Sequence, residues 1–465
     1  MATTSKNRWA FLGVISMGLL LIAADNSILY SALPTLEQQL HTTELEGLWV
    51  INAYPLVLAG LLLGTGTLGD RIGHRLMFEL GLGVFGLASL IAAFAPNPEV
   101  LIGARALLGA GAATMMPATL ALIRTTFSDP RELGTAIGVW GSVATIGAAA
   151  GPVAGGLLLE HYWWGSVFLV NLPIVAFALL ATHLMAPANN PNPAKRWDLL
   201  SSLYAMLAMA GLVLAIKELT HGEALLSAVA VAVAAAGATL FLRRQRTLSE
   251  PLIAFDVFRN RLFLAGVLGA MLSMFVLAGA ELLTTQRFQL AASMTPLEAG
   301  YINGAIAIAA FPTSIWGGAN LHRVGFRPLI SGGFALIALG LLAALASLHA
   351  SFGGFIAGVV VMGCGIGLTM SVTSTAIIGS APRHRAGMAS ALEEVSYEFG
   401  TLLAVAVLGS LMSAFTARSA LPRAEAIDQA YLDTMSVAVI VAVIATACTF
   451  YLLKGNPKET EYAHE

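Results

Sequence analysis

Long apolar runs follow one another along the whole chain, separated by short polar connections. A helix that crosses a bilayer needs about 20 predominantly apolar residues. Fourteen runs meet this requirement, near residues 9–31, 47–69, 76–95, 99–122, 134–158, 164–186, 198–217, 224–242, 262–286, 296–319, 329–348, 353–377, 386–414 and 431–453. Dividing 465 residues by fourteen gives about 33 for each helix and its connection, which leaves no room for a soluble domain. The pattern predicts an all-α integral membrane protein with 14 transmembrane helices.

Positive charges concentrate on one side of the membrane when these spans alternate in direction. With the N-terminus in the cytoplasm, the cytoplasmic side holds Lys6, Arg8, Arg71, Arg75, Arg124, Arg131, Lys195, Arg196, Arg243, Arg244, Arg246, Arg259, Arg261, Arg323, Arg327, Arg383, Arg385, Lys454 and Lys458. The outer side holds Lys217, Arg287, Arg418 and Arg423, and Arg105 lies inside the fourth span. A missing or added span would destroy this asymmetry, so we predict that both termini are cytoplasmic.

A short internal repeat divides the chain. Residues 69–75 follow the second span, and the similar residues 321–327 follow the tenth span. The two segments correspond when six helices are followed by two additional helices and then by six more. We therefore predict an N-terminal six-helix bundle over 1–186, two additional transmembrane helices with linkers over 187–258, and a C-terminal six-helix bundle over 259–465. The additional helices have few polar residues beyond their ends, so we expect them to face lipid and to carry no substrate chemistry.

Composition excludes several classes of protein. The chain is 57% hydrophobic and only 11% charged, whereas a soluble protein carries about 25% charged residues. Its net charge of -2 provides no field for a polyanion, so we expect no nucleic-acid partner. The sequence contains no P-loop and no histidine or cysteine spacing typical of a zinc site. We therefore expect a non-enzymatic transporter without cofactor or metal, driven by an ion gradient.

Six ionisable residues lie inside the predicted spans, where charged groups are costly and by default mark function. They are Asp25 in the first span, Arg105 in the fourth, Glu281 in the ninth, and Glu393, Glu394 and Glu398 in the thirteenth. On a helix Glu394 and Glu398 lie about 40° apart, and Glu393 shares a face with Tyr397. The alternative for these acids is a structural ion pair or an extension toward the membrane surface.

Buried carboxylates beside aromatic rings suit the exchange of a proton for an organic cation. An ionised carboxylate is costly in a low-dielectric cavity, so it holds either a proton or a cation. An entering cation expels the proton, and a proton arriving from outside expels the cation. Aromatic rings nearby would add cation–π attraction, and the candidates are Trp49, Trp140, Trp316 and Tyr397. Arg105 would modulate proton release if it approaches Asp25.

Several motifs resemble those of one transporter family. The turn with Gly66, Gly69, Asp70, Arg71, Gly73 and Arg75 matches the signature of the major facilitator superfamily between helices 2 and 3. Arg105 with Gly109 and Gly111 is similar to the fourth-helix motif. The fifth-helix motif of antiporters resembles Gly147, Gly151, Pro152, Gly155 and Gly156. Asp25 followed by Leu33-Pro34, together with residues 162–173, resembles the fourteen-helix drug:proton antiporters of that superfamily.

This resemblance implies two six-helix bundles plus two extra helices, and it implies roles for the motif residues. Arg105 is then linked to proton movement, and Asp70, Arg71, Gly73 and Arg75 to an inner gate. Glycines spaced four residues apart also let helix backbones approach closely, and Pro152 would bend the fifth helix. Ordinary small-residue packing explains the glycine spacing equally well.

Within the family the chain resembles the SmvA-type group, which exports methyl viologen and other quaternary cations. The resemblance implies small lipophilic cations and protons as the transported species, and a monomeric transport unit in the bilayer of a bacterial cytoplasmic (inner) membrane. One departure is Asn52 in the second span, where several relatives carry an acid. The candidates for the substrate cavity are Asn52, Trp140 and Tyr397.

Two rival functions are weighed against cation export. A proton-coupled transporter of a neutral or anionic metabolite is the first, and the excess of buried acids over buried arginine argues against it. A polytopic membrane enzyme or sensor is the second. It requires a catalytic or metal-binding constellation at one membrane face, and the sequence shows none.

Overall fold

A computed structural model of the chain describes residues 5–127, 129–194, 197–221, 223–248, 251–381 and 385–454. In these ranges the regular secondary structure is helical. Four of the charges predicted on the cytoplasmic side, Lys195, Arg196, Arg383 and Lys458, lie outside the described residues. The two chain ends lie outside them as well.

Thirteen helices in the described ranges are long and apolar enough to cross a membrane. The fourteenth predicted span, near 296–319, forms α11 (Pro296–Val324), a helix of 29 residues. Polar residues such as Asn303 and Asn320 lower its hydropathy, although its length suffices for a bilayer. The prediction of an all-α membrane protein is confirmed.

The chain forms two compact units. Unit 1 comprises Met1–Gly211, Val233–Arg246 and Thr295–Leu297, and unit 2 comprises Leu212–Ala232, Thr247–Met294 and Glu298–Glu465. The boundaries predicted after residues 186 and 258 stay a prediction. Unit 1 holds α1 (Ser5–Leu40), α2 (Glu44–Ile72), α3 (His74–Ala93), α4 (Pro98–Thr126), α5 (Pro130–His161), α6 (Ser166–Leu169) and α7 (Asn171–Met185), with parts of α8 (Leu199–His221) and α9 (Ala224–Thr247).

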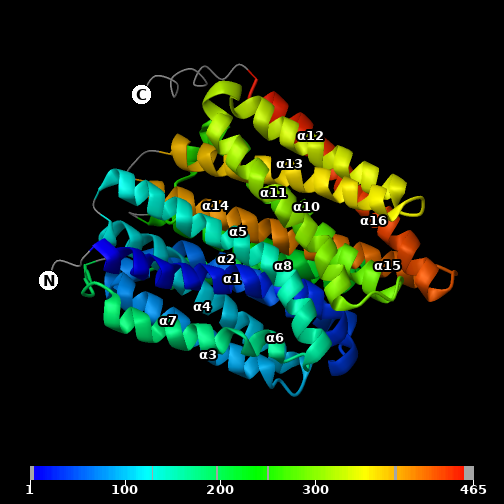
Figure 1. The fold of residues 1–465 in the computed structure, drawn as a ribbon, viewed down its shortest axis with the longest axis horizontal. Helices are drawn as coiled ribbons and strands as arrows, with labels where there is room; N and C mark the ends of the chain where they lie inside the picture. The colour runs from blue at the N-terminus through cyan, green and yellow to red at the C-terminus, as the bar shows by residue number, and fades with distance from the viewer. Residues whose placement is uncertain are drawn as a thin grey trace. The chain divides into compact units, whose positions relative to one another are not determined.

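Within unit 1, α1 packs against α5 and α7, and α4 packs against both α2 and α3; Figure 1 shows α1, α3, α4 and α7 running side by side. Local sequence sets where these helices begin. Thr43 and Glu46 form a capping box at the start of α2, which satisfies two otherwise unpaired backbone donors. Asn97 accepts a hydrogen bond from Val100 N at 3.0 Å at the start of α4.

The short turn between α2 and α3 depends on Gly73, whose φ is +96°. Its N–H donates to the carbonyl of Gly69 at 2.9 Å. In unit 2, Gly325 has a φ of +86° and its N–H donates to the Leu321 carbonyl at 2.8 Å. Side chains with a Cβ rarely adopt this region. The internal repeat in the sequence therefore has the same backbone geometry in both units.

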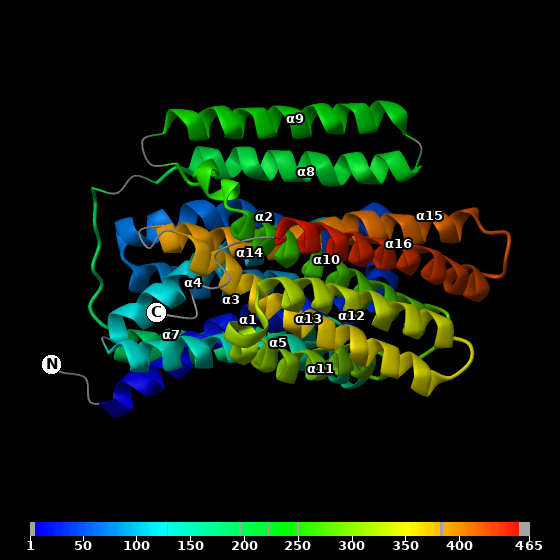
Figure 2. The ribbon, with the colours of Figure 1, turned by 90° about the horizontal axis from the view of Figure 1, so that it is seen from above.

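The two additional helices, α8 and α9, run side by side in Figure 2. In unit 1, Ser202 and Met206 of α8 lie against Gly64 and Gly60 of α2. Many apolar side chains on the pair are exposed, including Leu203, Leu207, Leu225 and Val229. Such exposure suits contact with lipid, as the sequence predicts.

Unit 2 contains the remaining elements. They are η1 (Phe255–Arg259), α10 (Arg261–Leu290), α11, α12 (Phe326–Ser347), α13 (Phe352–Ser380), α14 (Ala386–Ala404), the π-helical turn η3 (Val405–Gly409), α15 (Ser410–Arg418) and α16 (Arg423–Leu452). α10 packs against α13, α14 and α16, and α12 packs against α13 and α16. This packing places α14, with its three glutamates, beside α10 and α13.

Candidate functional site

Asp25 and Arg105 form a buried ion pair in unit 1. Asp25 is 3% exposed and Arg105 is fully buried, and Arg105 Nη1 donates to Asp25 Oδ2. Arg105 Nε also donates to the carbonyl of Val50 at 3.1 Å. The guanidinium carbon lies 4.7 Å from the centroid of the Tyr54 ring, a distance at which cation–π attraction acts. α2 therefore holds the arginine in place independently of Asp25.

Gly109 explains how α4 brings Arg105 so close to α2. A Cβ at Gly109 would lie 2.5 Å from the Tyr54 carbonyl oxygen. Only a residue without a side chain lets the two backbones approach this closely. Gly109, one helical turn after Arg105, thus allows the close packing of α4 on α2 that lets Arg105 reach its partners on α2.

The second carboxylate oxygen of Asp25 has a partner of its own. Asn171 Nδ2 donates to Asp25 Oδ1 at 3.1 Å and to Ser89 Oγ at 3.1 Å. Asn171 begins α7, directly after the break that follows α6, and it is 2% exposed. Asp25 is therefore held by Arg105 from α4 and by Asn171 from α7, and Ser89 on α3 accepts a second hydrogen bond from Asn171.

The predicted antiporter motif packs on the segment of α1 that carries Asp25. Cβ atoms added to Gly147, Gly151 and Gly155 would lie 3.0 Å from Ala23, 2.5 Å from Ser27 and 3.1 Å from Ile28 respectively. These glycines give α5 a flat face against α1, immediately around Asp25. Pro152 is buried inside α5. Gly156 lies against the backbone of Leu297, which belongs to the same unit.

The predicted gate residues surround the α2–α3 turn. Asp70 is exposed, and its Oδ1 lies 3.1 Å from His74 Nε2 across the turn. Arg71 is exposed. Arg75 bonds to Glu79 at 3.1 Å and donates to the carbonyl of His183 at 3.0 Å. A gating role for Asp70, Arg71, Gly73 and Arg75 stays a prediction.

The segment after α7 passes over this turn and closes it. Asn189 Nδ2 donates to the carbonyl of Ile72 at 2.7 Å, and Asn189 Oδ1 accepts from Leu76 N at 3.3 Å. Asn192 N donates to the Asp70 carbonyl at 3.0 Å. One asparagine thus pairs a carbonyl at the end of α2 and an N–H at the start of α3, groups that helix ends leave unpaired.

In unit 2, Glu393, Glu394 and Glu398 lie within about one and a half turns of α14. Glu393 and Glu398 are buried and Glu394 is half-buried. The Tyr397 hydroxyl lies 3.2 Å from Glu393 Oε1 and 3.5 Å from the Met370 carbonyl on α13, so it can donate to one of them at a time. The predicted shared face of Glu393 and Tyr397 is confirmed. Among the described residues, neither Glu393 nor Glu394 forms an ion pair with a cationic side chain.

Outside the membrane-spanning part, α14 is anchored to η1. Arg385 Nη1 lies 2.8 Å from Asp256 Oδ1 and 2.7 Å from Asp256 Oδ2. The hydrogen bond from Arg385 lowers the pKa of Asp256 below its ordinary value. This contact fixes the segment that leads into the carboxylate-bearing helix.

Glu281 is a buried acid on α10, 8% exposed. Asn303 of α11 donates to its backbone carbonyl at 3.2 Å and to Thr285 Oγ1 at 2.9 Å. Within the described part of the chain, no cationic side chain pairs with the Glu281 carboxylate. The acid thus lies in unit 2 without a fixed counter-charge.

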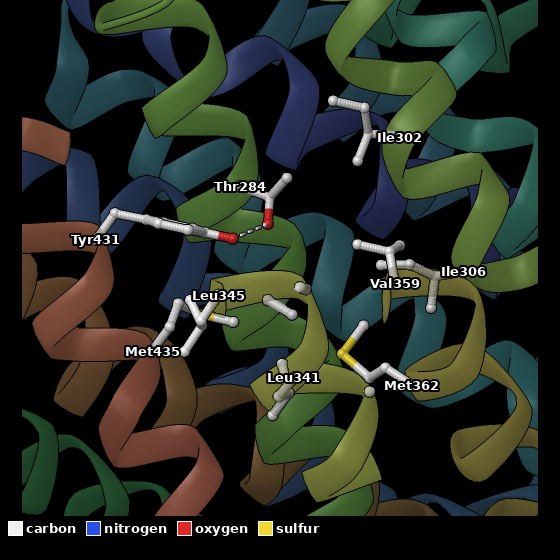
Figure 3. A pocket seen from close by; sticks show the side chains of 12 residues that line it. Thr284, Ile302, Ile306, Leu341, Leu345, Val359, Met362, Tyr431 and Met435 are labelled. Atoms are coloured by element: carbon white, nitrogen blue, oxygen red, sulfur yellow. Dashed lines mark hydrogen bonds between the residues drawn. The ribbon is translucent and has the colours of Figure 1, made fainter. Parts of the chain in front are cut away.

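A small apolar pocket adjoins this part of α10 (Figure 3). Thr284 and Tyr431 lie on its wall, 3.3 Å apart between their hydroxyl oxygens, with Met362 and Met435 on other sides. Its free space is about 10 Å³, enough for about one water molecule. The pocket is too small for an organic cation, so we do not assign it as the substrate cavity.

The remaining candidates occupy different environments. Asn52 on α2 is fully buried, and neither polar atom of its amide has a hydrogen-bond partner among the described residues. Trp140 on α5 and Tyr397 on α14 are half-buried, and Trp316 is 52% exposed. A place in the substrate cavity stays a prediction for Asn52, Trp140 and Tyr397.

Two functional candidates, Asn171 and Asn189, are absent from the residues predicted to form a site. Asn171 is a polar residue inside an otherwise apolar run, and Pro173 close behind it marks a helix start. That combination signals a buried polar contact at a helix N-terminus. Asn189 lies in a polar linker, where the sequence holds no sign of the turn that it closes.

Comparison with known proteins adds to this geometry. The sequence profile of the Major Facilitator Superfamily matches residues 15–293. The chain is 36% identical over 415 residues to the multidrug efflux pump LfrA of Mycolicibacterium smegmatis, covering 89% of this chain and 82% of that protein. It is also 36% identical over 422 residues to the methyl viologen resistance protein SmvA of Salmonella typhimurium, covering 89% and 85%.

A crystal structure of a bacterial homologue of the human lysosomal transporter Spinster, inward-facing and unoccupied, has the same fold. Its TM-score is 0.69 over 98% of this chain and 99% of that chain, at 16% sequence identity. Sequence and fold both indicate a multi-pass membrane transporter rather than an enzyme. The chain belongs to the Major Facilitator Superfamily.

Proposed function

We propose that this transporter is a proton-coupled exporter of lipophilic organic cations, such as quaternary ammonium compounds, dyes and viologens. It would work by alternating access in a bacterial cytoplasmic membrane, as a monomer with both termini in the cytoplasm. Its relatives include proteins named for multidrug efflux and for methyl viologen resistance. Methyl viologen is itself a permanently charged organic cation, so these relatives support the substrate class.

The observation that carries the proposal is the excess of buried acid in unit 2. Glu281, Glu393 and Glu394 have no cationic partner among the described residues, whereas Asp25 in unit 1 is matched by Arg105. A buried carboxylate without a counter-charge is costly to ionise. It is therefore neutralised by a proton or by a transported cation, and one excludes the other.

Tyr397 gives the α14 acids a second means of holding a cation. Its ring belongs to the same helix face as Glu393, and its hydroxyl can leave Glu393 for the Met370 carbonyl. A cation that displaces the proton at Glu393 would then meet both a carboxylate and an aromatic face. We assign the exchange of protons and cations to five buried acids: proton exchange to Asp25, and the exchange of protons for cations to Glu281, Glu393, Glu394 and Glu398.

The remaining residues support this cycle. Arg105 modulates proton exchange at Asp25. The glycines at 147, 151 and 155 with Pro152 let α5 move against α1, and Gly156 lets α5 pack closely on Leu297. Asp70, Arg71, Gly73 and Arg75 serve the cytoplasmic gate. We place Asn52, Trp140 and Tyr397 on the path of the substrate.

Ethidium uptake into proteoliposomes under an imposed pH gradient tests the proposal, with and without a protonophore. Uptake that collapses with the protonophore is the expected result. Methyl viologen tested in parallel extends the substrate class to dications. If neither cation moves with the gradient, cation export is wrong, and the same vesicles then test anionic and neutral metabolites as the rival substrates.

Charge-neutral variants on α14 test which acid couples the two flows. We expect at least one of Glu393→Gln, Glu394→Gln and Glu398→Gln to abolish gradient-driven uptake. Ser396→Ala is the matched control, since within the described residues its hydroxyl donates to the Leu392 carbonyl of the same helix and to no side chain. If all three acid variants transport normally, α14 is not the coupling element.

A further inference from the structure

Asn171, a neutral residue at the start of α7, donates a hydrogen bond to one oxygen of the Asp25 carboxylate. Its Nδ2 lies 3.1 Å from Asp25 Oδ1 and 3.1 Å from Ser89 Oγ. An amide nitrogen carries two hydrogens and can donate to both acceptors at once. Asn171 is 2% exposed and Ser89 is fully buried, so water does not compete readily for these bonds.

The two oxygens of Asp25 are thus held by different parts of unit 1. Oδ2 receives Arg105 from α4, and α2 fixes this arginine through the Val50 carbonyl and the Tyr54 ring. Oδ1 receives Asn171 from α7, with support from Ser89 on α3. The arginine and the amide are therefore held in place by different helices.

Among the described residues, the other helices packed on this part of α1 place no charged side chain in contact with Asp25. α5 presents the glycines at 147, 151 and 155 to α1. The charged contact between α1 and α5, Arg8 with Glu132, lies four to five helical turns away along α1. In the described part of the chain, Arg105 is therefore the charged group that contacts Asp25, and the titratable Tyr54 lies on the far side of the guanidinium.

We propose that Asn171 is a positioning residue that controls when Asp25 Oδ1 takes up a proton. While its amide donates to Oδ1, the hydrogen bond stabilises the ionised carboxylate and hinders the approach of a proton to that oxygen. A shift of α7 or α3 relative to α1 withdraws the amide and opens Oδ1 to a proton, while α2 keeps Arg105 where it is. The role rests on the proposed function, since it presumes proton exchange at Asp25.

Pro173 weakens the junction between α6 and α7, although Val170 between them keeps helical dihedral angles and its N–H donates to the Ser166 carbonyl at 3.1 Å. α6 ends at Leu169 and α7 begins at Asn171, so one residue, Val170, separates the two helices. Pro173 in the first turn of α7 has no N–H to continue the helix backwards. Asn171 thus lies at the end of a helical segment, where a small rotation of α7 displaces its amide.

Asn171→Leu removes the donor while keeping a side chain of similar size, and Asn171→Ser keeps a hydroxyl donor. Thr182→Val, at a fully buried position further along α7, is the matched control. Three quantities are measured on the full chain in proteoliposomes. They are ethidium uptake driven by a pH gradient, ethidium counterflow at equal pH, and proton entry without ethidium, read by a trapped pH dye.

We expect Asn171→Leu to lower gradient-driven uptake about tenfold, the effect of losing one hydrogen bond to a charged group. Counterflow, which needs no net proton movement, should stay near the parent value. Proton entry without ethidium should rise, because Oδ1 is open in every conformation. Asn171→Ser should recover part of the coupling, and Thr182→Val should behave like the parent.

A parallel fall in uptake and counterflow would show a purely structural role for Asn171, and parent-like coupling would show no role; either result overturns the inference. If Asn171→Leu does not accumulate, Ser89→Ala decides between the same outcomes, since it removes the second acceptor of the amide. Absence of gradient-driven uptake by the parent overturns the proposed function instead. The parent measurement therefore separates the two failures.

Discussion

The Asp25–Arg105 pair should show strong energetic coupling, because each charge is buried against the other. The test uses three variants, Asp25→Asn, Arg105→Gln and the two combined. Asparagine and glutamine keep most of the size of the original side chains and remove their charge. Each single variant leaves one charge buried without its partner, and the combined variant leaves none.

The structure sets the magnitude. Asp25 is 3% exposed and Arg105 is fully buried, so water cannot solvate the remaining charge in a single variant. Breaking a buried ion pair from one side costs about 3–5 kcal/mol of stability. Replacing both partners by neutral groups is often close to neutral, and hydrogen bonds lost with Val50 or Asn171 add about 1 kcal/mol each. The combined variant should therefore cost less than either single variant.

The free energy of unfolding in mixed detergent–dodecyl sulfate micelles measures these effects. The pair Arg8–Glu132 is the control. It also joins two helices, α1 and α5, with Arg8 Nη1 3.0 Å from Glu132 Oε2, but both of its side chains are partly exposed. Its double-mutant cycle should yield less than about 1 kcal/mol of coupling. Additive losses for Asp25 and Arg105, with the combined variant the least stable, would refute the reasoning from burial.

Gly151→Val forces a side chain onto α1, because even a Cβ added at this position would lie 2.5 Å from Ser27 Cβ. We expect the free energy of unfolding to fall by about 1–3 kcal/mol in the same assay. Gly141→Val, on the same helix but with no described atom within 4 Å of where its Cβ would lie, should cost little. Asn189→Ala removes two of the three bonds that the segment after α7 makes to the α2–α3 turn, so protease cleavage within that turn should become faster. Arg385 lowers the pKa of Asp256, and this stabilisation is present above the ordinary carboxyl pKa of about 3.9 and is lost at lower pH. The unfolding midpoints of the parent and Asp256→Asn should therefore differ at neutral pH and converge as the pH falls below about 4.

The sequence predicts the helices well because each apolar run has to satisfy its own backbone hydrogen bonds inside a bilayer. It also predicts the α2–α3 turn and its counterpart, since Gly73 and Gly325 occupy equivalent places in the repeat and both adopt positive φ. The ionisable residues in the spans stand out for the same reason, because a membrane leaves few of them without a role. For Arg105 the sequence leaves open whether it approaches Asp25, and the structure shows that the two side chains form an ion pair.

Contacts between distant segments could not be predicted from local patterns. Asn171 and Asp25 are 146 residues apart, and Asn189 and Ile72 are 117 apart. Periodicity assigns a residue to a helix face, but it does not say which helix meets that face. For the same reason the sequence marks Asn52 as a cavity candidate without showing that its side chain is fully buried.

The two groups of buried acids are held in opposite ways, and this difference assigns them different tasks. Asp25 has a fixed cation on one oxygen and an amide on the other, so a transported cation finds no charge there to neutralise. Glu281, Glu393 and Glu394 have no cationic partner among the described residues, so under the proposed function a proton or a transported cation neutralises them. Substitutions at the unit 2 acids should therefore change which cations are transported. Substitutions around Asp25 should change how tightly proton movement is tied to transport, and leave the choice of cation alone.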